Sequence, residues 1–467
     1  MKRRNVLVSF ASGMTGTTGF GFPVCTDREN EVCNVTRLYS AQMQDLVVIR
    51  DIQDIQRVLK SDLSKISIGG GRYSMGGQTA ITGGVQVDMR SLNQLVWLNA
   101  PQKLVRVQAG MRWRNLQEIL DPLGLSVQTM QSYANFTVGG SVSVNCHGRY
   151  IGHGPIINSI RSMQLVLPDG QILEVNRNNN TELFHAAVGG YGAVGVVTEV
   201  ELFVDENFAI ERNSHSIPIK DYADWFKEKI QTDETVLLHN ADLTLPYFDR
   251  PFAVTWRRTS KSVNVSQHLR PQGKKDAAMQ TGIWAMTELP QGHRLRSIAQ
   301  ESQKSSMVVW RNYEASIDVS ELEPRTRRFS TFVLQEYFVP VSNFSPYVRE
   351  LSKLMQQGGR HTLNISIRHS KADKNALMSW AHEDVFCFVV YYKQRMNSNS
   401  EKPVQQWTRA MIDLALRYGG TYYLPYQPHA TQEQFEQAYP NVQALRKLRK
   451  TLGAARMSNM MWDRYQV

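Results

Sequence analysis

A glycine-rich turn that directly follows a short apolar strand constrains this chain most. The segment reads Ser67-Ile68-Gly69-Gly70-Gly71-Arg72-Tyr73-Ser74-Met75-Gly76-Gly77-Gln78, with five glycines in nine positions. Glycine lets the main chain fold tightly and present consecutive backbone N–H groups, as diphosphate-binding turns do. No Gly-Lys-Ser/Thr follows, which disfavours nucleoside-triphosphate hydrolysis. The turn therefore predicts a loop that binds a diphosphate-containing cofactor.

A second glycine cluster, Gly190-Tyr191-Gly192-Ala193-Val194-Gly195, formally satisfies the dinucleotide pattern G-x-G-x-x-G. That fingerprint needs a strand before it and a helix after it. Here a helix-like segment, 181–188, comes first and an apolar strand, 196–202, follows. Because the order is inverted, we do not expect NAD bound on a Rossmann unit.

A third segment lies between the two clusters and is rich in small residues. It reads Phe136-Thr137-Val138-Gly139-Gly140-Ser141-Val142-Ser143-Val144-Asn145-Cys146-His147-Gly148-Arg149. Small side chains allow a flat ring system to approach the backbone closely. Together, the three segments resemble the FAD-binding domain of the vanillyl-alcohol oxidase / p-cresol methylhydroxylase family over about residues 38–206.

This resemblance implies an α+β fold, in which a PCMH-type FAD-binding domain of two α+β subdomains precedes a C-terminal substrate (cap) domain with an antiparallel sheet. We expect the FAD-binding domain at 38–206 and the cap domain at 207–410. The segment 411–467 would complete the active site and return to the FAD domain. After Glu206 the segments become longer and more mixed and contain more aromatic residues, which places the domain boundary there.

The resemblance also implies which residues contact FAD. Many family members attach the flavin through a histidine in the first loop, and Arg72 occupies that position here, so we expect non-covalent FAD. His147 is read as a flavin or substrate contact, with a structural histidine as the alternative. The expected cofactor residues are Gly69, Gly70, Gly71, Arg72, Tyr73, Ser74, Gln78, Gly110, Gly139, Gly140, Ser143, Asn145, His147, Gly148, Gly190, Gly195 and Val197.

The second half resembles sugar and aldonolactone oxidases and, more loosely, decaprenylphosphoryl-ribose oxidase. The matching segments are 335–340, 365–368 and 420–426. Those relatives carry an active-site glutamate, arginine and lysine. Glu336 and Arg368 match the first two, whereas Tyr426 or His429 occupies the neighbourhood of the lysine. Glu336 and Arg368 could equally form a buried structural ion pair.

The resemblance thus implies an FAD-dependent oxidase or dehydrogenase acting on a CH–OH group of a small sugar, polyol or aldonolactone-like substrate. Hydride would pass to flavin N5 while Glu336, Tyr426 or His429 takes or orients the proton and Arg368 holds the substrate. The electron acceptor stays open. Two other readings are an NAD(P)H-dependent flavin reductase and a flavin-binding module without catalysis.

The net charge and the cysteine spacing further limit which partners and metals we expect. Lys and Arg number 53 against 42 Asp and Glu, giving a net charge of +11, but the basic residues are scattered and form no nucleic-acid motif. A solvated surface is therefore expected, with no nucleic-acid partner. The four cysteines form no C-x-x-C pair or zinc spacing, so no metal is expected; Cys25 and Cys33 could pair in an oxidising compartment.

The first 24 residues begin with Lys2-Arg3-Arg4 and continue with a mildly apolar stretch, which resembles a twin-arginine export signal. Export to the periplasm is one reading of this segment. A basic N-terminus on a cytoplasmic protein is the other. No other apolar run approaches the roughly 20 residues that span a bilayer, so no membrane span is expected.

Overall fold

The computed structural model describes residues 25, 28–61, 64–244, 247–273, 282, 307–319, 327, 329–358 and 362–467. The predicted export signal at 1–24 lies outside these residues. Cys25 and Cys33 form a disulfide, with their Cα atoms 5.8 Å apart. No helix of the described chain is long and apolar enough to cross a membrane.

The first subdomain is a small parallel sheet with one packed helix. Its strands β3 (Asp45–Val48), β5 (Val85–Asp88) and β4 (Ile66–Gly69) lie in that order. Helix α1 (Ile52–Lys60) connects β3 to β4 and begins at a capping box between Asp51 and Asp54. Its apolar residues recur at helical spacing and pack on the sheet. A short hairpin of β1 (Glu31–Cys33) and β2 (Ser40–Gln42) precedes it.

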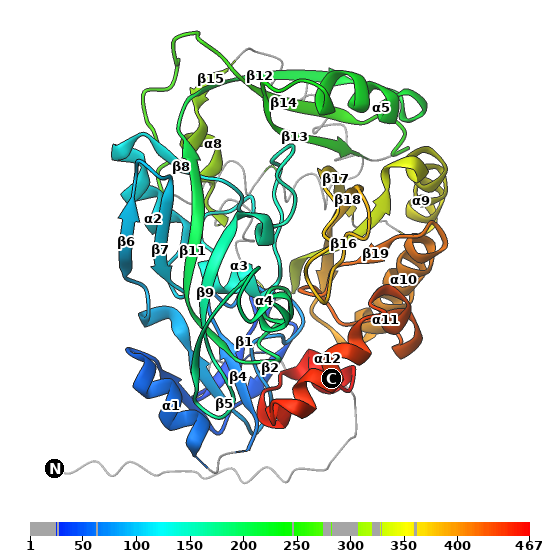
Figure 1. Ribbon diagram of the computed structural model, residues 1–467. Coiled ribbons are helices and arrows are strands. Elements are labelled where there is room, and N and C mark those ends of the chain that lie inside the picture. Colours follow the sequence, from blue (N-terminus) through cyan, green and yellow to red (C-terminus); the bar gives the residue numbers. More distant parts are fainter. Residues whose placement is uncertain are drawn as a thin grey trace, which may run out of the picture.

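The second subdomain is an antiparallel sheet in the order β10-β9-β11-β7-β6, with β8 paired to the far end of β11. Helices α2 (Trp113–Leu120), α3 (Val138–Ser143) and α4 (Thr181–Ala187) belong to it. In Figure 1, α3 and α4 lie between this sheet and the first subdomain. The strands are β6 (Leu95–Asn99), β7 (Leu104–Gln108), β8 (Leu125–Val127), β9 (Ile160–Val166), β10 (Ile172–Asn176) and β11 (Val196–Glu206).

The cap region is built on an eight-stranded sheet in the order β15-β12-β14-β13-β17-β18-β16-β19, and all pairs are antiparallel. Helices α5 (Ile219–Phe226), α9 (Phe344–Gly358) and α10 (Ser398–Arg417) accompany it, and α8 (Arg311–Ala315) follows β15. The strands are β12 (Ala209–Ser216), β13 (Val236–Leu243), β14 (Phe252–Arg258), β15 (Val308–Trp310), β16 (Ser330–Pro340), β17 (Thr362–Ser370), β18 (Val385–Arg395) and β19 (Thr421–Tyr422).

The C-terminal helices return to the first subdomain. They are α11 (Gln432–Ala438), α12 (Val442–Thr451) and α13 (Met460–Arg464). Figure 1 shows this red segment beside the blue strands from the start of the chain. Ser458 N–H donates to the Ile66 carbonyl at 2.9 Å, which joins the two ends directly.

The α+β class predicted from sequence is confirmed. The inverted order around the second glycine cluster is also present, since α4 precedes it and β11 follows it. The sequence pattern at 376–380 predicts a helix, but in the structure this segment is a turn. There the Asp373 carboxylate accepts the N–H groups of Asn375 and Ala376 at 2.9 and 3.0 Å. Such side-chain bonds compete with helix formation.

Candidate active site

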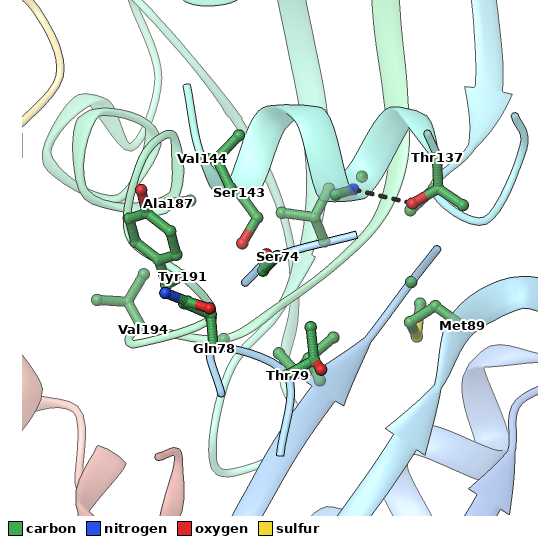
Figure 2. Close-up of a pocket in the computed structure, with 18 residues that line it drawn as sticks. Ser74, Gln78, Thr79, Met89, Thr137, Ser143, Val144, Ala187, Tyr191 and Val194 are labelled. Carbon is green, nitrogen blue, oxygen red and sulfur yellow. Dashed lines mark hydrogen bonds between the residues drawn. The ribbon is translucent and has the colours of Figure 1, made fainter. Parts of the chain in front are cut away.

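A cavity with about 700 Å³ of empty space lies where the two subdomains of the first half meet. All three glycine-bearing segments contribute to its wall, as predicted. Figure 2 shows Ser74, Gln78 and Thr79 from the first glycine turn around the same pocket as Ser143, Ala187 and Tyr191 from later segments. Of the predicted cofactor residues, those that line it are Gly70, Ser74, Gln78, Gly139, Gly140, Ser143, Gly195 and Val197.

Small residues hold the first turn against the T-V-G-G segment. A Cβ atom on Gly70 would lie 2.4 Å from Thr137 Oγ1, and one on Gly139 would lie 2.7 Å from Ala109 Cβ. Thr137 Oγ1 in turn accepts the Gly140 N–H at 3.3 Å (Figure 2). The need for glycine at position 70 thus arises from contact between two loops, which together form one wall of the cavity.

Gln78 has a role that the sequence did not indicate. Its Nε2 donates to the carbonyls of Leu424 and Tyr426 at 2.7 and 2.8 Å, and its Oε1 accepts the Gly76 N–H at 2.9 Å. The side chain therefore ties the first glycine turn to the C-terminal half. It lines the cavity, but its amide is used to position the segment that carries Tyr426.

Arg72 has a positive φ of 60° and turns its guanidinium toward β5. Its Nη2 lies 3.1 Å from Asp88 Oδ2 and also contacts Gln86. Burial lowers the pKa of this guanidinium, and the Asp88 carboxylate partly offsets that effect. Arg72 therefore stands at the turn as a structural cation.

Six other predicted cofactor residues line neither this cavity nor a second cavity that adjoins it. Asn145 donates to Asp373 Oδ2 at 2.6 Å, and His147 contacts Glu336. The four glycines pack where a Cβ atom would meet a neighbour at 2.0 to 2.7 Å; they are Gly69, Gly110, Gly148 and Gly190. These six residues have packing or positioning contacts in this structure, and their contact with the cofactor stays a prediction.

A second cavity with about 700 Å³ of empty space adjoins the first. The two share several wall residues, among them Gly70, Ser74 and Thr137. The second also reaches Leu334 on β16 and the Tyr426 segment, so it lies between the FAD-binding half and the cap sheet. Predicted cofactor residues Gly71, Arg72 and Tyr73 line it as well.

Two of the predicted catalytic residues, Tyr426 and Glu336, come together beside this cavity. Tyr426 lines it, and the Tyr426 hydroxyl donates to Glu336 Oε2 at 3.2 Å. Glu336 itself is only 2% exposed and lies behind the tyrosine. Burial, followed by the charge of Glu336, raises the pKa of Tyr426 well above its usual value, so the phenol stays protonated.

Arg368 lies two strands away from Glu336 across the cap sheet. It is paired in register with Cys387 on β18, and Cys387 is paired with Phe338 on β16. Its charge acts on both Tyr426 and Cys387. The buried Arg368 Nε has no hydrogen-bond partner within the described residues. Among the described residues, Glu336 is paired with His147 and no ion pair joins it to Arg368, contrary to the alternative left open by the sequence.

His429, the fourth predicted catalytic residue, does not line either of these cavities. Its Nδ1 lies 2.8 Å from Thr408 Oγ1 and its Nε2 lies 3.4 Å from the Tyr39 hydroxyl. Burial lowers its pKa to about 3, so the ring is neutral. The structure assigns His429 to the packing between α10 and the N-terminal segment.

Sequence reasoning missed several wall residues of the first cavity. Thr137 could have been found, because it opens the T-V-G-G motif. Tyr191 and Gly192 lie inside the second glycine cluster. Others contribute only after folding; the missed residues are Ile68, Thr79, Met89, Ala109, Thr137, Val144, Ala187, Tyr191, Gly192 and Val194.

Comparisons with known proteins agree with this architecture. Residues 46–176 match the FAD binding domain family, and residues 200–465 match the D-arabinono-1,4-lactone oxidase family. The chain is 30% identical over 175 residues to L-galactono-1,4-lactone dehydrogenase of Brassica oleracea, covering 38% of this chain and 28% of that protein. It is 21% identical to L-gulonolactone oxidase of Mus musculus, covering 84% and 87% of the two chains.

A solved structure supports the fold across both halves. Cholesterol oxidase from B. sterolicum superposes with a TM-score of 0.69 at 14% identity, covering 93% of this chain and 96% of that chain. The fold and the cavity between the glycine segments are those of a protein with an FAD-binding domain. Within that class, the chain belongs to the D-arabinono-1,4-lactone oxidase family.

Proposed function

We propose that this protein oxidises a CH–OH group of a sugar-lactone-like substrate, which binds in the second cavity beside the flavin. The observation that carries the proposal is the adjacency of two cavities. One is walled by the glycine segments of the FAD-binding half, and the other reaches from these segments to Tyr426 and Leu334 of the cap region. The names of the family and of two relatives specify aldonolactones as the first substrates to try.

Bound FAD would supply the hydride acceptor, and the protein would supply geometry. The first cavity is formed by the segments that the family resemblance assigns to the cofactor. The Tyr426 hydroxyl stands at the wall of the second cavity, and the positive charge of Arg368 acts on it. This arrangement can orient a substrate hydroxyl and hold a proton as the C–H bond breaks.

Anaerobic mixing of the yellow protein with substrate tests this function without requiring the electron acceptor. We expect L-galactono-1,4-lactone, L-gulonolactone or D-arabinono-1,4-lactone to bleach the flavin absorbance, and Tyr426→Phe to slow bleaching roughly 10²-fold while FAD is retained. The control is NADPH, which should not bleach the protein. Bleaching by NADPH alone would instead identify a reductase, and no bleaching by any of these compounds would identify a binding module.

The flavin is proposed to be bound non-covalently. Arg72 occupies the position of the linking histidine, and its guanidinium is engaged by Asp88 and Gln86. Acid precipitation should therefore leave FAD in the supernatant. Yellow colour that stays with the precipitated polypeptide would contradict this proposal.

Export through the twin-arginine route is also a proposal. It is supported by Arg3-Arg4 near the N-terminus and by the Cys25–Cys33 disulfide, a bond typical of oxidising compartments. Replacing both arginines with lysine should retain the protein in the cytoplasm of the producing cell. An unchanged distribution between cytoplasm and periplasm would refute export by this route.

A further inference from the structure

His147 is separated from the first cavity and faces the cap sheet. Its Nε2 lies 2.7 Å from Glu336 Oε1, and both side chains are almost completely buried. The ring lies among three aromatic neighbours, with centroid distances of 4.9 Å to Trp380, 5.7 Å to Phe338 and 5.8 Å to Tyr423. Such an environment excludes water, so a proton on this pair exchanges with solvent only through neighbouring polar groups.

The hydrogen-bond partners assign the ring tautomer. His147 Nδ1 lies 3.4 Å from the Gly148 carbonyl, which can only accept, so Nδ1 carries a hydrogen. Glu336 Oε1 has no aligned hydrogen-bond donor among the described residues, and the 2.7 Å contact to His147 Nε2 places a nitrogen where it can share a proton with this oxygen. His147 and Glu336 are therefore placed as a pair that can hold one proton between them.

The other carboxylate oxygen of Glu336 points to the substrate cavity through Tyr426. The Tyr426 hydroxyl donates to Glu336 Oε2. Of Tyr426, Glu336 and His147, it is Tyr426 that lines the cavity. Three groups thus follow one another from the cavity to the interior: Tyr426, Glu336 and His147. The titratable or charged groups around Glu336 and its partners are Tyr191, Tyr423, Tyr439, Arg368 and Cys387.

We propose that His147 and Glu336 form a buried proton-accepting dyad and that Tyr426 connects this dyad to the substrate. This inference rests on the proposed function. The substrate hydroxyl gives its proton to the Tyr426 oxygen, while the original Tyr426 proton moves to Glu336 Oε2. The shared proton then resides fully on His147 Nε2, which allows Glu336 to become neutral. The hydride leaves the substrate carbon for the flavin, so the substrate loses one hydride and one proton.

In this arrangement, His147 is a positioning residue that acts through Glu336. Neither it nor Glu336 lines the cavities, so substrate binding should not depend on them directly. The raised pKa of Tyr426 agrees with a phenol that passes a proton on and does not act as a phenolate base. Loss of the imidazole should therefore slow flavin reduction and change its pH dependence, while FAD and the substrate still bind.

His147→Gln is the decisive variant, because its amide can keep an N–H near the Nε2 position but cannot take up a proton. We expect the rate of anaerobic flavin reduction by an aldonolactone to fall about 10²-fold, with the apparent dissociation constant of the lactone changed less than about threefold. The pH profile of flavin reduction should also differ between the wild type and the variant.

His239→Gln is a matched control. His239 is also buried, lies 2.9 Å from the Tyr222 hydroxyl and 2.9 Å from Thr255 Oγ1, and belongs to β13 of the cap sheet. Its replacement should leave the rate and the pH profile of flavin reduction unchanged. A His147→Gln protein with the wild-type rate and profile would overturn the dyad while leaving the proposed function intact.

A second measurement does not depend on turnover. In oxidised, FAD-loaded protein labelled with ¹⁵N-histidine, the His147 signals are assigned by their absence in His147→Gln. We expect Glu336→Gln to shift the Nε2 signal of His147, because the shared proton is lost from that contact. An unshifted signal would overturn the dyad. If no lactone bleaches the wild-type flavin, the proposed function fails by itself, and this measurement still decides whether the shared proton exists.

Discussion

At the scale of single residues, the close contact of Gly70 with Thr137 is the most demanding feature of the cofactor cavity. A Cβ atom at position 70 would meet Thr137 Oγ1 at 2.4 Å, whereas the next contact, with Thr137 Cβ, would be an ordinary 3.6 Å. The hydroxyl also accepts the N–H groups of Gly140 and, at 3.4 Å, of Gly71. A side chain at position 70 would therefore displace an oxygen that orders both loops.

We expect Gly70→Val to abolish FAD retention during purification and Gly70→Ala to destabilise the protein by about 1–3 kcal/mol, the usual cost of overpacking. The test is a double-mutant cycle with Thr137→Ala, read by urea unfolding and by the FAD-to-protein absorbance ratio. Removing the hydroxyl should reduce the cost of Gly70→Ala. Equal costs in both backgrounds would show that the hydroxyl is not what excludes a side chain.

At the scale of elements, the C-terminal segment holds two cofactor loops in place. Arg449 Nη1 donates to the Ala193 carbonyl at 2.7 Å, Asn459 Nδ2 to the Tyr191 carbonyl at 3.2 Å, and Trp462 Nε1 to the Gly190 carbonyl at 3.2 Å. On the other side, the Met460 N–H contacts the carbonyls of Gly77 and Ala80. Residues 449–462 therefore bridge the first glycine turn and the second glycine cluster.

We expect Trp462→Phe to speed the release of FAD several-fold, because it removes one donor worth about 1 kcal/mol and keeps most of the ring packing. The dissociation rate is measured by the recovery of free flavin fluorescence after dilution. Trp256→Phe is the control, because the buried Trp256 Nε1 on β14 has no hydrogen-bond partner among the residues described. Equal release rates in the two variants would show that this hydrogen bond does not hold the loop.

At the scale of the whole molecule, three buried histidines make folding sensitive to acid. Burial lowers the pKa to about 3 for His239 and His429 and to about 4 for His369. Each is neutral in the folded state but has a pKa of about 6.5 when unfolded. Between these values the unfolded chain binds more protons, so the stabilisation is fully present above about pH 6.5 and is lost as the pH falls toward 4.

The free energy of unfolding should therefore decrease by about 1 kcal/mol per pH unit for each histidine between pH 6 and 4. Urea titrations at several pH values check this slope. His429→Gln should flatten the slope by one proton relative to wild type, although it lowers stability at neutral pH. A variant with an unchanged slope would show that His429 is not neutral in the folded protein.

The sequence by itself determined the α+β class, the strand before the first glycine turn, and the order of helix, glycine cluster and strand around residues 190–195. It also indicated the three segments that wall the first cavity. These features depend on local periodicity and on glycine placement, which are written in consecutive residues. It also identified Glu336, Arg368 and Tyr426 through the family resemblance. It could not determine that Glu336 lies behind Tyr426, or that Arg368 stands apart from Glu336.

Only the tertiary structure decided the partners that come from distant parts of the chain. His147 and Glu336 are far apart in the sequence and meet because the loop that follows α3 lies against β16. Gln78 donates to the carbonyls of residues 424 and 426. Both ring nitrogens of His429 contact other side chains, those of Tyr39 and Thr408. Such contacts depend on how the cap sheet closes over the FAD-binding half, and no short-range pattern in the sequence encodes that closure.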